Sequence, residues 1–137
     1  MNKFYKGINN YFFKRLIKGE NVFYYEKENN IYLSDRYFIA IIPINEFVLD
    51  ISKMKEVNLE TFVKKIDLYN YRDISNWDQK EKLIYLYDKE NYKIINIDYM
   101  KLFSMNRLMI DINKDISPVL CYDEDKIVGL ILPIKEK

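Results

Sequence analysis

Acidic residues in the last third of the chain have the types and spacing that come closest to a catalytic pattern. Asp111, followed by Glu124-Asp125-Lys126, matches the loose D…(D/E)xK arrangement of two-carboxylate nucleases. In such a site the acids hold Mg²⁺ and the lysine positions the attacking water. The run from Glu124 to Lys126 is equally typical of an exposed hairpin turn. A Mg²⁺-dependent nuclease is therefore a third hypothesis, behind the two given below.

Several other chemistries are excluded by the residue types that the chain lacks. It contains no histidine and a single cysteine, so it cannot assemble a Ser-His-Asp or Cys-His nucleophile, an ordinary zinc site or a redox CxxC pair. Its three glycines are too far apart for a phosphate-binding loop. We therefore expect a protein that is not an enzyme and that holds neither a cofactor nor a metal.

The N-terminal segment concentrates positive charge that could contact a partner. Residues 1–19 contain five basic side chains and no acid, so their charge is +5 and the remainder of this +1 chain carries −4. At about 100° per residue of helix, Lys3, Lys14 and Lys18 fall on one face, and Phe13 and Ile17 flank them. Such a face can contact phosphates, an acidic protein surface or an anionic membrane, or it can simply be solvated. The predicted partner-binding residues are Lys3, Lys6, Phe13, Lys14, Ile17 and Lys18.

The aromatic content is the second feature that suggests a contact surface. The chain has 13 tyrosines, and those on strands could stack nucleobases, anchor a protein interface or belong to the core. The strands offer few basic residues beside them, which favours a protein interface over nucleic acid. Part of this aromatic enrichment reflects the base composition of the genome. Residues encoded by AT-rich codons are abundant and those encoded by GC-rich codons are rare, with 20 Ile, 18 Lys and 14 Asn against 1 Ala and 3 Gly. The strand tyrosines considered are Tyr24, Tyr32, Tyr85, Tyr87 and Tyr92.

The elements that must position these side chains can be predicted from periodicity and turn residues. Phe4, Ile8, Phe12 and Leu16 recur every fourth residue and predict a helix over 2–18, with Gly19 as its left-handed C-terminal cap. Strands at 22–25, 31–33 and 37–42 predict a three-stranded meander. Two helices should follow, a short one over 46–49 capped by Asn45 and a longer one over 58–66 capped by Asn58.

The second half predicts further hairpins. Residues 69–80 are polar and turn-rich, with Trp77 as a large anchor. Strands are expected at 83–87 and 92–97, a short helix begun by Asp98 over 99–103, a strand at 107–112 and a final hairpin of 119–122 with 127–132. Cys121 lies in an apolar run and should be a small buried hydrophobe. The sequence thus predicts a single α+β domain over 1–137, with an antiparallel sheet of hairpins and three or four helices.

Two segments carry a resemblance to a known family. Residues 117–120, a turn, and residues 127–134 (Ile-Val-Gly-Leu-Ile-Leu-Pro-Ile) resemble the terminal hairpin of bacterial DNA sliding-clamp domains. Residues 31–41, an apolar strand, a displayed loop and a second apolar strand, look like another part of such a domain. The resemblance implies a clamp-like module that associates with nucleic acid through its basic helix. A clamp ring consists of several such modules. A single module would therefore either assemble into a ring with other copies or not encircle DNA.

The chain also resembles, in kind and without a shared motif, the small proteins of phages and mobile elements in AT-rich bacteria, including anti-CRISPR inhibitors. That resemblance implies a stoichiometric inhibitor of a host factor. No apolar stretch approaches the roughly 18 residues that span a bilayer, and one unpaired cysteine fits a reducing compartment, so we expect a cytoplasmic protein without membrane partners. The leading hypothesis is a non-catalytic inhibitor or adaptor, monomeric or homodimeric, that binds a host protein or ribonucleoprotein complex. The alternative is a nucleic-acid-associated, clamp-like module.

Overall fold

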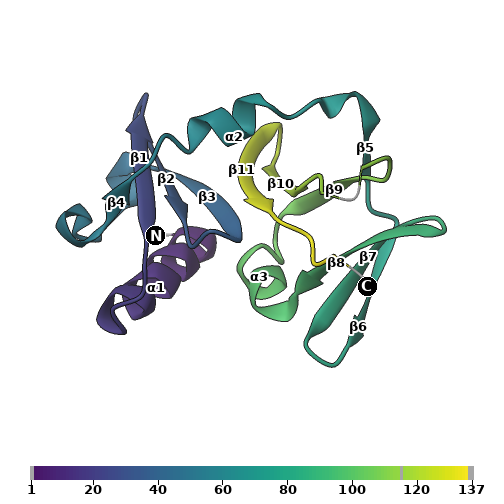
Figure 1. Ribbon diagram of the computed structural model, residues 1–137, viewed down its shortest axis with the longest axis horizontal. Helices are drawn as coiled ribbons and strands as arrows, with labels where there is room; N and C mark the ends of the chain where they lie inside the picture. The colour runs from purple at the N-terminus through teal and green to yellow at the C-terminus, as the bar shows by residue number, and fades with distance from the viewer. Residues whose placement is uncertain (1, 115, 136–137) are drawn as a thin grey trace. The chain divides into compact units, whose positions relative to one another are not determined.

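The computed structural model describes residues 2–114 and 116–135, and over these ranges the chain has an α+β fold with three α-helices and eleven strands (Figure 1). The predicted fold class is therefore confirmed. The chain divides into two compact units, an N-terminal unit of residues 1–65 and a C-terminal unit of residues 66–137. Each unit is described by itself, and the single domain over 1–137 stays a prediction.

The helix α1 (Lys3–Ile17) opens the N-terminal unit and is bounded as the sequence predicts. The side chain of Asn2 caps its start by accepting a hydrogen bond from the Phe4 N–H at 2.7 Å. At its end Gly19 adopts φ +73°, and the Gly19 and Glu20 amides donate to the carbonyls of Leu16 and Arg15. This paired closure is a Schellman motif, which requires a left-handed residue at the glycine position.

The predicted meander is confirmed as β1 (Phe23–Lys27), β2 (Asn30–Ser34) and β3 (Phe38–Pro43), which pair antiparallel in that order. The short β4 (Lys55–Glu56) adds parallel to β1. α1 lies along one face of this sheet (Figure 1), where Phe12 stacks on Phe38 with ring centroids 5.4 Å apart. The alternation of side chains along the strands supplies the apolar face that α1 covers. The buried core here includes Ile8, Phe12, Ile31, Leu33, Phe38, Ala40 and Ile42.

The segments after β3 differ from the sequence-based expectation. In place of a helix over 46–49 there is a short 3₁₀ helix, Ile44–Glu46, with Pro43 instead of Asn45 at its N-cap. A second 3₁₀ helix covers Ile51–Lys53. The predicted helix is interrupted at Phe47, whose backbone is extended (φ −91°, ψ 128°), and the Glu46 carbonyl and the Val48 amide on either side of it are bonded to the side chain of Asn9 in α1.

The helix expected over 58–66 is also shorter, since α2 covers Glu60–Lys64. Its N-cap is Leu59 and no side chain caps it. The backbone carbonyl of Asn58 accepts a hydrogen bond from Thr61 Oγ1 at 2.8 Å. An ion pair attaches α2 to the sheet: Lys27 Nζ of β1 lies 2.7 Å from Glu60 Oε1. Lys64 Nζ reaches the same oxygen at 3.1 Å.

The C-terminal unit contains two groups of strands. β5 (Tyr71–Asp73), β9 (Arg107–Asp111), β10 (Val119–Asp123) and β11 (Lys126–Ile131) pair antiparallel in the order β11-β10-β9-β5. β6 (Asn76–Lys80), β7 (Leu83–Asp88) and β8 (Asn91–Asn96) form a separate antiparallel sheet. A 3₁₀ helix, Leu68–Asn70, precedes β5, and α3 (Ile97–Leu102) follows β8. The buried side chains here include Ile84, Leu86, Ile95, Phe103, Ile110 and Leu120.

Both hairpins that the sequence predicts in this unit are confirmed, and Cys121 is fully buried, as expected. The stretch 69–80, expected to be turns, instead supplies β5 and β6. Because β6 lies at the edge of its sheet, one side of the strand faces solvent and polar side chains are tolerated there. Trp77 is 51% exposed on β6 and is not the buried anchor that we expected. Asn96, not Asp98, caps α3 by accepting from the Asp98 N–H at 2.8 Å.

Candidate functional site

Five of the six side chains predicted to bind a partner lie on the exposed face of α1, and the sixth, Lys18, is its exposed C-cap. The opposite side of the helix carries the buried Ile8 and Phe12. Phe13 and Ile17 are the outliers on this face, because they are 50% and 68% exposed although both are large and apolar. The positions confirmed as exposed are Lys3, Lys6, Phe13, Lys14, Ile17 and Lys18. That they bind a partner stays a prediction.

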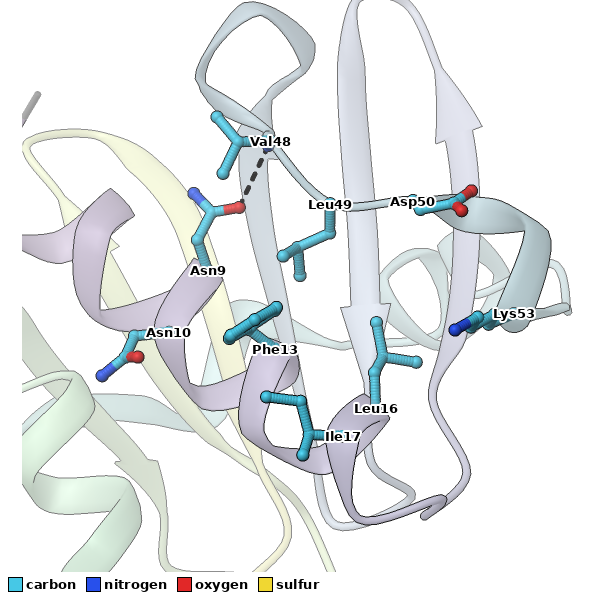
Figure 2. Close-up of a pocket in the computed structure, with 9 residues that line it drawn as sticks. All are labelled: Asn9, Asn10, Phe13, Leu16, Ile17, Val48, Leu49, Asp50 and Lys53. Atoms are coloured by element: carbon cyan, nitrogen blue, oxygen red, sulfur yellow. Dashed lines mark hydrogen bonds between the residues drawn. The ribbon is translucent and has the colours of Figure 1, made fainter.

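A pocket lies beside this face, between α1 and the segment 48–53 (Figure 2). Its volume is about 540 Å³, which lies within the range of roughly 300–1,000 Å³ typical of ligand-binding clefts. Phe13 and Leu49 are turned toward one another across it (Figure 2), and Val48 on the second wall is 66% exposed. The lining residues are Asn9, Asn10, Phe13, Leu16, Ile17, Val48, Leu49, Asp50 and Lys53.

Asn9 fixes the distance between the two walls. It is 5% exposed, and its Nδ2 donates to the carbonyls of Tyr5 and Glu46, each at 2.9 Å. Its Oδ1 accepts from the Val48 N–H at 3.2 Å, the dashed line of Figure 2. A buried amide that satisfies three backbone groups holds the segment against the helix, because losing it would leave those groups unpaired. The pocket is therefore a built feature of the N-terminal unit.

Asn9 was missed by the sequence analysis. Its partners lie 37 and 39 residues further along the chain, and no local pattern reports a contact at that distance. One signal is present in the sequence: Asn9 directly follows Ile8, which belongs to the apolar row that faces the sheet. A polar side chain at the border of a buried helix face needs a hydrogen-bond partner.

The second wall carries two charged residues. Asp50 Oδ1 accepts from the Ser52 N–H at 2.9 Å and so caps the 3₁₀ helix Ile51–Lys53. Hydrogen bonds from the backbone and the hydroxyl of Ser52 lower the pKa of the Asp50 carboxyl below its ordinary value. Asp50 is consequently an anion at neutral pH, and Lys53 lines the same wall.

The carboxylates of the nuclease hypothesis have a different environment. Asp111 is 4% exposed, and its two oxygens accept from the Asn113 N–H at 2.9 Å and from Ser117 Oγ at 3.2 Å. Glu124 lies at the exposed turn between β10 and β11. Among residues 2–114 and 116–135, no three or more His, Cys, Asp or Glu side chains gather closely enough to hold a metal ion. The nuclease hypothesis gains no support from this arrangement.

Three of the strand tyrosines are brought together on the sheet of β7 and β8. The rings of Tyr85, Tyr87 and Tyr92 lie 5.5 to 6.5 Å from one another, and Lys80 Nζ lies 4.9 Å from the centre of the Tyr85 ring. Because the three rings pack on each other, part of their surface is buried within the cluster and is not available to a partner. The other two, Tyr24 and Tyr32, belong to the N-terminal unit, where Tyr32 packs against Tyr25 at 6.1 Å.

Comparisons with protein-family models, with curated proteins and with solved structures find no match to this chain. The resemblances to sliding-clamp modules and to small phage proteins therefore stay predictions. Among the helices of residues 2–114 and 116–135, none has both the length and the apolar character needed to cross a membrane.

Proposed function

We propose that this protein acts without catalysis, by binding a protein partner through the exposed face of α1 and the pocket beside it. The observation that carries the proposal is the joint exposure of Phe13, Ile17 and Val48 around one concavity. Exposed apolar side chains are ordinary when scattered, but a group of them around a hollow marks an interaction surface. Lysines surround the group on the helix, in the pattern of an apolar centre with a polar rim that protein interfaces show.

The resemblance in kind to small phage and mobile-element proteins suggests the class of partner. We place the partner among the host's protein or ribonucleoprotein complexes, in the cytoplasm, with inhibition or modulation of a defence complex such as a CRISPR effector as the outcome. Binding of this kind is stoichiometric and needs neither metal nor nucleotide. The lack of histidine and of phosphate-binding glycine loops agrees with such a role.

The proposal is tested by affinity capture from bacterial host lysate with quantification of every recovered protein. The bait is the full chain, compared with the double variant Phe13→Ser/Ile17→Ser and with the control Met105→Ser. Met105 is 83% exposed and is not part of the candidate surface, so its loss removes an exposed apolar side chain that the proposal does not use. A protein recovered in stoichiometric amount by wild type and control, and lost with the double variant, supports the proposal. Equal recovery by all three baits contradicts it.

A second candidate function is favoured by a separate observation: α1 and its C-cap residue carry four exposed lysines, and the helix contains no acid. Such a face could contact nucleic-acid phosphates, as the clamp resemblance implies. Binding through Lys3, Lys14 and Lys18 would weaken steeply between about 50 and 200 mM salt. DNA and RNA titrations over that range decide the matter. The apolar Phe13 and Ile17 in the same face are better suited to a protein than to phosphates, which is why this function ranks second.

A further inference from the structure

Building on the proposed function, we infer that the pocket between α1 and the segment 48–53 receives an acidic amphipathic helix of the partner. Apolar side chains of that helix would enter the pocket, and its carboxylates would meet the lysines of α1. Three properties of the pocket lead to this occupant: its apolar lining, the sign of the charge around it, and the kind of backbone that forms its walls.

The lining fits side chains that recur along one face of a helix. Phe13, Leu16 and Ile17 are spaced i, i+3 and i+4 on α1, and Val48 and Leu49 face them from the other wall. Two helices that meet along such a row interlock their side chains, and helix-in-groove recognition uses anchors at the same spacing. A volume of about 540 Å³ holds more than one large apolar side chain. The occupant therefore presents at least two of them, one helical turn apart.

The exposed charges that α1 and its C-cap present beside the pocket are all positive, and Lys14 and Lys18 directly follow the lining residues Phe13 and Ile17. Lys3, Lys6, Lys14 and Lys18 are exposed, and none of the four forms an ion pair with a described residue. Arg15 differs, because Glu20 holds its guanidinium at 2.9 Å.

On the second wall, Lys53 and Asp50 offset one another, and Asp50 is engaged by the Ser52 amide. The unpaired charge thus belongs to the lysines of α1. An acidic partner segment complements it, and a basic one would be repelled.

The walls of the pocket favour a helix over an extended peptide. One wall is the surface of α1, whose backbone groups are bonded within the helix. On the other, the Val48 amide is taken by Asn9 and the Ser52 amide by Asp50. Neither wall is a strand edge, so an extended peptide would find no ladder of donors and acceptors and would bury unpaired backbone groups. A helix satisfies its own backbone and needs only side-chain contacts.

The test uses three synthetic peptides of about 18 residues, roughly five helical turns. The first carries Leu at i, i+3, i+4 and i+7 with Glu on the flanks. The second replaces every Glu with Lys, and the third keeps Glu but replaces the four Leu with Ser. Binding to the full chain is measured by fluorescence anisotropy, and the site is mapped by backbone amide chemical shifts. We expect the first peptide to bind at least about tenfold more tightly than either of the others.

Variants locate the binding and separate its two components. Ile17→Ser should weaken the first peptide, whereas Met105→Ser should leave its affinity unchanged, since the exposed Met105 does not line the pocket. Lys14→Gln should weaken the first peptide and remove part of its salt dependence. Shift changes should concentrate at residues 9–18 and 47–54.

Several outcomes would overturn the inference: equal binding of the acidic and basic peptides, no binding of the first peptide, or tighter binding to DNA or to anionic phospholipid vesicles. If the first peptide fails while capture of a host protein still depends on Phe13 and Ile17, the inference falls and the proposed function stands. If capture does not depend on those residues, the proposed function falls as well.

Discussion

Gly129 of β11 lies directly against the ring of Phe103, so closely that a Cβ atom at position 129 would overlap Cε1 and Cζ of that ring. Phe103 is fully buried just after α3, and the glycine pairs with Cys121 beside a shift in register that leaves Val128 of β11 without a partner in β10. A glycine inside a strand usually weakens it, but here it allows the close approach of backbone and ring. The contact joins α3 to the sheet of the C-terminal unit.

Replacing Gly129 with alanine should therefore destabilise the protein. The added methyl group has no space unless the enclosed ring moves, and overpacking of this kind costs about 1–3 kcal/mol of unfolding free energy. Urea denaturation followed by circular dichroism measures the loss. In the double variant Gly129→Ala/Phe103→Leu the smaller side chain relieves the clash, so the two single effects should not add. Strict additivity would contradict the contact.

The hydroxyl of Tyr11 should stabilise the N-terminal unit through a buried carboxylate. It donates to Asp35 Oδ2 at 2.6 Å, and Asp35 is 2% exposed. Tyr11→Phe removes this charge-assisted hydrogen bond and should lower the unfolding free energy by about 1–3 kcal/mol. Tyr69→Phe is the control, because Tyr69 is 81% exposed. Equal stabilities of the two variants would show that the bond contributes nothing.

The attachment of α2 to β1 should depend on pH. The hydrogen bond from Lys27, supported by Lys64, lowers the pKa of the Glu60 carboxyl below its ordinary value of 4.5. A carboxyl whose pKa is lower in the folded state stabilises the fold above its unfolded pKa, and the contribution disappears as pH falls through the folded pKa. Glu60→Gln should therefore be less stable than wild type at pH 7, and the difference should shrink as the pH falls below 4.5 through the lowered pKa of the folded state. A difference that does not change with pH would exclude this linkage.

Cys121 should be unreactive in the folded protein. Burial raises the pKa of its thiol well above the ordinary value, so the thiol stays protonated at pH values where an exposed cysteine forms thiolate. Reaction with Ellman's reagent at about pH 8 should be slow in buffer and rapid in denaturing urea. In buffer the rate should follow unfolding and so rise in the Gly129→Ala variant. Fast labelling of the native wild type would show that the site is open to solvent.

Local patterns in the sequence predict the elements whose stabilising contacts are themselves local. Apolar side chains at every fourth position from Phe4 to Leu16, followed by the C-terminal cap Gly19, predict both ends of α1 to within one residue. Short turns between alternating strands likewise identify the hairpins. Exposure of Phe13 and Ile17 follows from the same helical geometry, since both lie away from the buried stripe.

Two of the failures have a different cause, because they involve contacts that are remote in sequence. The helix expected over 46–49 is replaced by bonds from Asn9, nearly forty residues earlier. The strand β5 owes its existence to pairing with β9, so its polar residues give no local signal. The pocket arises from the first of these contacts, which is why the sequence predicts one wall of the candidate site and not the other.

The turns of the hairpins connect this fold to the base composition of its gene. Glu28, Glu81, Lys89 and Glu124 all adopt a left-handed backbone, with φ between 52° and 58°. Glycine reaches that conformation without penalty, whereas other L-residues are disfavoured there by about 1–2 kcal/mol each. Glycine codons begin with two guanines, and a chain with only three glycines places Glu and Lys, encoded by adenine-rich codons, at these turns. A composition poor in glycine therefore leaves conformational strain at four hairpin turns, and this strain lowers the free energy of unfolding.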